Sequence, residues 1–110
     1  MANTFKVKTF DGSSTAANAA MNIYTVPAST TTVVIGLTIS NTTSSQITVD
    51  IKLSAASTVF LAKNIPIPAG GAFEYMSGNK IVMETTHTIS VVSDTANSAD
   101  TALSLSLIHI

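Results

Sequence analysis

Apolar residues alternate with polar ones along most of this chain. The alternation runs through Gln46–Leu53, Thr30–Asn41, residues 103–107 and the N-terminal ten residues. The side chains predicted to share apolar faces are Ile47, Val49, Ile51 and Leu53; Leu103, Leu105 and Leu107; Val33, Ile35, Leu37 and Ile39; and Phe5 and Val7. A period of two is typical of β-strands that bury one face and expose the other. Each stretch is therefore predicted to be a strand with one buried face.

Clusters of turn-forming residues separate these stretches about every ten residues. Turns are predicted at residues 11–14, 27–29, 41–45, 66–71, 77–79 and 94–101. Weaker strands are predicted at Asn22–Val26, Thr58–Asn64, Ala72–Met76, Lys80–Glu84 and Thr86–Ser93. The chain is therefore predicted to be all-β: an antiparallel β-sandwich, Ig-like or jelly-roll, of eight or nine short strands. Residues 1–110 form a single domain in this interpretation, with residues 1–15 as an extended arm or a first strand.

The composition excludes several classes of protein. Charged side chains make up 10% of the 110 residues, with a net charge of −1, against about 25% in typical soluble domains. No basic excess is present to neutralise phosphates, which predicts that no nucleic acid is bound. The chain has no cysteine, so disulfides and thiolate metal sites are excluded. No apolar stretch is long enough to span a bilayer, and the N-terminal alternation of Lys with apolar residues is unlike a signal peptide.

No arrangement typical of catalysis is present. His87 and His109 fall in phase with strand residues, and no Gly-x-Ser-x-Gly motif accompanies the many serines. Glu74 and Glu84 flank a predicted turn, where two solvated acids are expected. No spacing of His or acidic residues suggests a metal, and no glycine-rich loop suggests a nucleotide. We predict a protein without catalytic residues, metal, cofactor or small-molecule substrate.

The low charge favours association between chains, because near-zero net charge gives little protection against assembly. Phe10, Tyr24 and Val34 lie out of phase with the main apolar set of their strands and are predicted to be exposed. We predict a homo-oligomer in which part of this surface is buried against partner chains. The predicted interface residues are Phe5, Phe10 and Tyr24.

Several blocks of the sequence resemble small virion structural proteins of tailed bacteriophages, of the kind carried by marine and cyanobacterial phages. In the first half these blocks are IYTVPAST at residues 23–30, VVIGLTISNT at 33–42 and ITVDIK at 47–52. In the second half they are IPIPAGG at 65–71, GNKIVME at 78–84 and TISVVS at 88–93. The resemblance covers residues 21–93 and includes no catalytic motif. It implies a β-sandwich that attaches to the capsid, neck or tail of a particle.

The expected function is that of a capsid decoration (cement) protein, which binds the outer capsid surface and stabilises the head through contacts between subunits. The implied partners are the major capsid protein or other virion proteins. The implied location is the virion, after synthesis in the host cytoplasm without a signal peptide. Residues 1–10 are a candidate arm that pairs with the sheet edge of a neighbour. One alternative is a neck, tail or fibre component, and another is a carbohydrate-binding or adhesive module, which the absence of Trp disfavours.

Overall fold

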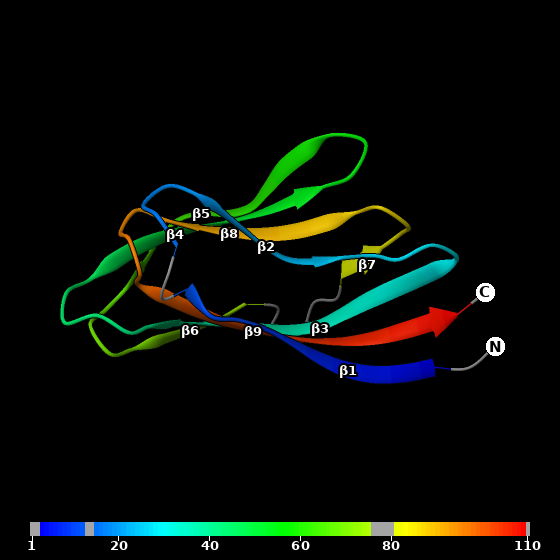
Figure 1. The fold of residues 1–110 in the computed structure, drawn as a ribbon, viewed down its shortest axis with the longest axis horizontal. Coiled ribbons are helices and arrows are strands. Elements are labelled where there is room, and N and C mark those ends of the chain that lie inside the picture. Colours follow the sequence, from blue (N-terminus) through cyan, green and yellow to red (C-terminus); the bar gives the residue numbers. More distant parts are fainter. Residues whose placement is uncertain (1–2, 13–14, 76–80, 110) are drawn as a thin grey trace.

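The structure, a computed structural model, describes residues 3–12, 15–75 and 81–109. Within these residues, nine strands form two antiparallel sheets that lie face to face (Figure 1). The strands are β1 (Asn3–Phe10), β2 (Ala20–Thr25), β3 (Thr30–Asn41), β4 (Ile47–Ser54), β5 (Thr58–Ile67), β6 (Ala72–Tyr75), β7 (Ile81–Met83), β8 (Thr88–Ser93) and β9 (Ala99–His109). The predicted fold class, an antiparallel β-sandwich, is confirmed. The turn predicted at residues 77–79 lies outside the described residues.

The strand order shows how distant parts of the chain meet. One sheet has the order β1-β9-β3-β6, with β7 also paired to β3, and is called the β1 sheet. The other has the order β2-β8-β4-β5 and is called the β2 sheet. Only the β4–β5 and β6–β7 connections stay within one sheet, whereas all the others cross between sheets. The first and last strands of the chain are therefore neighbours, paired from Asn3↔Ile108 to Phe10↔Thr101.

The hydrophobic core lies between the two sheets. Its most completely buried large side chains are Met21, Val34, Leu37, Ile39, Ile47, Val49, Ile51, Ile67, Met83, Ile89, Leu103 and Leu105. The faces predicted for β4 and β9 are correct. Ile47, Val49 and Ile51 are buried, Leu53 is half-buried against the core, and the alternating leucines of β9 are buried. Burial of each such side chain contributes about 1.5–3 kcal/mol, so this core is the main source of stability.

β3 changes its buried face halfway along, which the sequence analysis did not predict. Val34 pairs with Leu105 and Gly36 pairs with Ser104, so Ile35 is an extra residue in a β-bulge. Thr30, Thr32 and Val34 face the core before the bulge, and Leu37, Ile39 and Asn41 face it afterwards. The predictions that Val33 and Ile35 are buried and that Val34 is exposed are wrong: Val34 is fully buried and Ile35 is 40% exposed. The physical reason is the bulge, which inverts the alternation.

A second bulge corrects the prediction for Tyr24. The pairing of β2 with β8 shifts between Asn22 and Tyr24, so Ile23 is the extra residue. Met21 and Tyr24 therefore both face the core, and Tyr24 is only 8% exposed. Its hydroxyl lies 3.1 Å from the Thr32 Oγ1 in a buried hydrogen bond. The prediction that Tyr24 is exposed and contributes to an interface is wrong, because its ring and hydroxyl are used inside the domain.

Candidate interaction surface

The outer face of the β1 sheet carries four exposed large apolar side chains. Phe5 and Val7 of β1 are 76% and 61% exposed. Val82 of β7 is 59% exposed, and Ile35 protrudes at the bulge of β3. These four residues are called the apolar surface. β3 and β7 are paired, whereas β9 lies between β1 and β3, so Ser104 and Ser106 of β9 separate Phe5 and Val7 from Ile35 and Val82.

The strand register places these side chains on the side of the sheet away from the core. Phe5 lies opposite Ser106, which lies opposite Val33, which in turn lies opposite Val82. Directly paired residues in a sheet share a face, and the β9 residues that alternate with Ser106 are buried leucines. The apolar alternation of β1 was expected to mark a buried face. It marks an outward face instead, so Phe5 and Val7 are candidates for an interaction surface.

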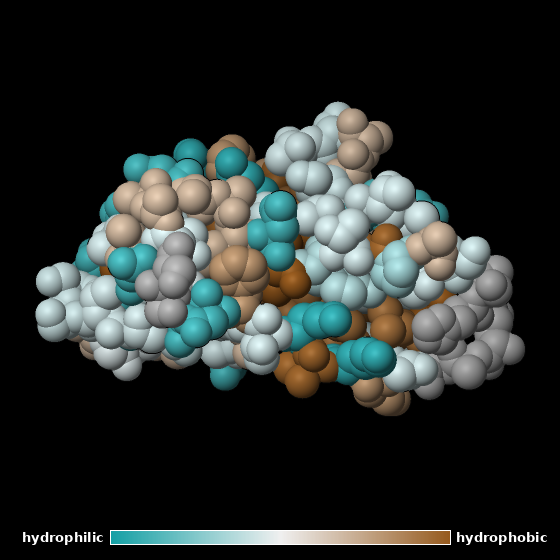
Figure 2. All heavy atoms as spheres, in the orientation of Figure 1, coloured by the Kyte–Doolittle hydropathy of each residue, from teal (hydrophilic) through white to brown (hydrophobic). Residues whose placement is uncertain are grey.

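The edge of the sheet at β1 combines this apolar character with positive charge. Lys6 and Lys8 alternate with Phe5 and Val7 and are also exposed. Figure 2 shows hydrophilic and hydrophobic side chains beside one another along the lower edge, where β1 lies in Figure 1. The two lysines point to the opposite side of β1 from Phe5 and Val7, so the charges flank the apolar surface at the sheet edge.

The outer side of the β2 sheet differs, because the ring of its exposed Phe60 is in contact with two lysine ammonium groups. Phe60 of β5 is 49% exposed, but the Lys63 Nζ lies 4.2 Å from its ring centroid and the Lys52 Nζ lies 5.2 Å from it. The Lys63 Nζ is also 3.8 Å from the Asp50 Oδ2. Cation–π contacts of this kind give the exposed ring of Phe60 favourable partners within its own chain. The apolar surface on the β1 sheet is therefore the stronger candidate for an interface.

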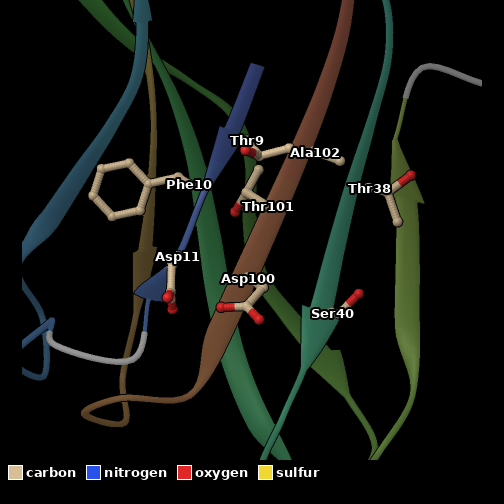
Figure 3. Close-up of a pocket in the computed structure, with 8 residues that line it drawn as sticks. All are labelled: Thr9, Phe10, Asp11, Thr38, Ser40, Asp100, Thr101 and Ala102. Carbon is tan, nitrogen blue, oxygen red and sulfur yellow. The ribbon is translucent and has the colours of Figure 1, made fainter. Parts of the chain in front are cut away.

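Two hollows lie on the outer face of the β1 sheet. The first, of about 380 Å³, is lined by Thr9, Phe10, Asp11, Thr38, Ser40, Asp100, Thr101 and Ala102 (Figure 3). The second, of about 280 Å³, lies at the bulge and is lined by Ile35, Gly36, Leu37, Thr38, Glu74, Tyr75 and Ser104. Thr38 lines both hollows, so they adjoin each other next to the apolar surface. Hydroxyl groups and carboxylates line them, which adds hydrogen-bonding capacity to the same face.

The polar groups near these hollows have structural roles. The Asp100 Oδ1 accepts a hydrogen bond from the Gly12 N–H at 3.0 Å and fixes the end of β1 to the start of β9. Away from these two hollows, the His87 Nδ1 accepts a hydrogen bond from the Glu84 N–H at 3.1 Å, within the turn before β8. Among residues 3–12, 15–75 and 81–109, no cluster of three or more His, Cys, Asp or Glu could hold a metal ion, and no helix is long and apolar enough to cross a membrane.

The three predicted interface residues differ in their exposure to solvent. Phe5 is the most exposed large apolar side chain described. Phe10 is half-buried and packs against the core, and Figure 3 shows its ring turned away from Thr38 and Ser40. Tyr24 is inside the core. Sequence reasoning missed Val7, Ile35 and Val82, although Gly36 within an apolar strand is a signal of the bulge that exposes Ile35.

The comparisons with known proteins bear on the fold. No protein-family model and no curated protein matches this sequence. A chain in the structure of infectious bursal disease virus Gx strain superposes with a TM-score of 0.56 at 15% identity, over 97% of this chain and 32% of that one. A chain of the VP2 subviral particle of infectious bursal disease virus gives a TM-score of 0.55 at 11% identity, over 97% and 33%.

A pentameric capsid protein from metagenomic phage sequences is more distant. Its TM-score is 0.42 at 18% identity, over 94% of this chain and 62% of that one. This chain spans about a third of the length of the infectious bursal disease virus chains that it matches. The class is therefore the two-sheet antiparallel β-sandwich that those virus chains also contain.

Proposed function

We propose that this chain is a non-enzymatic structural protein of a phage particle, and specifically a decoration protein that binds the outer surface of the capsid. The observation that carries the proposal is the apolar surface of Phe5, Val7, Ile35 and Val82 on one sheet face. Exposed apolar side chains that gather on one face of a soluble protein mark candidate sites of interaction. The resemblance to small virion proteins and the likeness of the fold to virus chains support the same role.

The proposed mechanism is burial of the apolar surface against the major capsid protein. Full burial of a Val or Phe side chain contributes about 1.5–3 kcal/mol, part of which offsets the cost of association. A protein that binds only the assembled shell stabilises that shell by mass action. The hydroxyls of the adjoining hollows would form the polar rim. In this account the protein acts in the virion, after synthesis in the host cytoplasm.

The alternatives differ in how well the side chains support them. A neck, tail or fibre component would use the same fold and the same apolar surface, and it differs in its number of copies per particle. A carbohydrate-binding module is less well supported, because sugar sites use exposed aromatic platforms. Tyr24 is buried and Tyr75 is half-buried, with its hydroxyl donating to the Leu61 carbonyl at 3.1 Å. The buried and half-buried tyrosines therefore favour a structural protein of the particle over a carbohydrate-binding module.

The double substitution Phe5→Ser and Val7→Thr tests the apolar surface. We expect its affinity for capsids assembled without this chain to fall by at least about a hundredfold, because roughly 3 kcal/mol of apolar burial is lost. The free energy of unfolding should stay within about 0.5 kcal/mol of the original, since both side chains are exposed. Co-sedimentation with purified capsids measures the affinity, and urea unfolding measures the stability.

The matched control is Val59→Thr, which changes a side chain of similar exposure on β5 of the other sheet. This variant should bind capsids as the original chain does. Equal binding by the double variant and the control would contradict the proposal that the outer face of the β1 sheet is the contact surface.

A further inference from the structure

β1 is held in its own domain mainly by main-chain pairing. None of its described side chains is buried: Phe5, Lys6, Val7, Lys8 and Thr9 are exposed, and Thr4 and Phe10 are half-buried. Lys6 and Lys8 lie opposite the buried Leu105 and Leu103 of β9. Their exposure means that the β2 sheet does not cover β1 at these positions. Apart from Phe10 at the end of the strand, which packs against the core, separation of β1 from β9 therefore costs little buried apolar area. This makes β1 a strand of low local stability.

The edge of β9 that β1 covers would be left open by that separation. Eight β9 residues, from Thr101 to Ile108, pair with β1, while the other edge of β9 stays paired with β3. Unpaired main-chain groups at a sheet edge recruit another strand. A strand with the sequence of β1 fits this edge in register and side-chain alternation, and every copy of the chain has one. We propose that β1 exchanges between copies, so that β1 of one chain pairs with β9 of the next.

Gly12 sets the point about which β1 would swing. It is buried, its N–H donates to the Asp100 Oδ1 at 3.0 Å, and its carbonyl accepts from the Thr15 N–H at 3.2 Å. These contacts hold the chain beside the start of β9, so separation that begins at Asn3 would stop near Gly12. The eight residues of β1, at about 3.3 Å each, form an arm of roughly 26 Å. A neighbouring copy whose β9 edge lies within that length could receive the arm.

The charges on β1 favour exchange over the addition of strands to its own free edge. Lysines on an edge strand oppose pairing with a further strand, and Lys6 and Lys8 occupy the middle of β1. β1 is thus suited to leave as a donor, and β9 is suited to receive it. This inference does not rest on the proposed function, because exchange between copies needs no particle and is measured on the purified chain.

A reversible covalent lock tests the exchange. The chain has no cysteine, so the double variant Val7→Cys/Ser104→Cys introduces a single cross-strand pair at directly opposed positions. The Cα separation of opposed residues in antiparallel strands suits a disulfide. Oxidation at low micromolar concentration would fasten β1 to β9 of the same chain. Light scattering after size exclusion then measures the mass from micromolar to millimolar concentration.

We expect the original chain and the reduced variant to form dimers or larger species as concentration rises. The oxidised variant should stay monomeric, and a reductant should restore its assembly. Two outcomes would overturn the proposal: a monomeric original chain at every concentration, or assembly of the oxidised variant equal to that of the reduced one. If the disulfide of the Val7→Cys/Ser104→Cys variant does not close within one chain, the double variant Phe5→Cys/Ser106→Cys provides a second opposed pair on the same face.

Discussion

Replacement of Gly12 by alanine is expected to lower the free energy of unfolding by about 3 kcal/mol, the upper end of the usual cost of overpacking. A Cβ at this position would overlap the carbonyl oxygen of Ala99 and lie 3.3 Å from the Met21 Sδ. The carbonyl belongs to the first residue of β9, so it cannot move without disturbing that strand. The hydrogen bond from the Gly12 N–H to Asp100 would also be strained. Urea unfolding followed by circular dichroism measures the change.

Gly36→Ala is the matched control, because no atom lies within 4 Å of a Cβ built there. Its free energy of unfolding should stay within about 0.5 kcal/mol of the original. If the two glycine variants are equally stable, Gly12 does not hold the junction of β1 and β9 in the way described, and the pivot proposed for β1 loses its basis.

Replacement of Asn41 by alanine is expected to cost about 3 kcal/mol, because it leaves buried polar groups without partners. Asn41 is the last residue of β3 and is 3% exposed. Its Nδ2 lies 2.8 Å from the Ser45 carbonyl oxygen and 3.0 Å from the Ile67 carbonyl oxygen. Its Oδ1 accepts from the Thr43 N–H at 2.9 Å. The side chain thereby ties the end of β3 to the end of β5 in the other sheet, and thermal and urea unfolding measure its contribution.

Two further variants separate the hydrogen bonds of Asn41 from its size. Asn41→Asp keeps the shape but replaces the donor nitrogen with an oxygen that faces carbonyl groups, so we expect a loss at least as large. Asn22→Ala removes an exposed asparagine of β2 and should change stability by no more than about 0.5 kcal/mol. A fully stable Asn41→Asp variant would show that these donor bonds contribute little.

The alternation of apolar residues was sufficient to predict the strands. It located β3 at Thr30–Asn41 with both ends correct, and the buried faces of β4 and β9 followed from the same pattern. Turn-forming residues also predicted the connections between strands: Ser29 and Asn97 lie in predicted turns, and each has a positive φ of 54°. These features depend on local sequence, so one chain is enough to predict them.

Features that depend on pairing between distant strands could not be predicted. The bulge at Ile23 has no glycine or proline to signal it, and it is visible only in the shifted pairing of β2 with β8. For an edge strand such as β1, alternation shows that Phe5 and Val7 share a side but not whether that side faces the core. That choice follows from the pairing of β1 with β9, at opposite ends of the chain. The apolar surface was therefore predicted only through Phe5.

The copy number of this chain in purified particles, relative to the major capsid protein, is the decisive test of a decoration role. Quantitative mass spectrometry of virions whose genome encodes the chain would measure it. We expect an abundance comparable to that of the capsid protein, because a decoration protein covers the whole shell. A reproducible trace level would contradict a decoration role and favour a neck, tail or fibre component. Complete absence from the particles would contradict a virion function altogether.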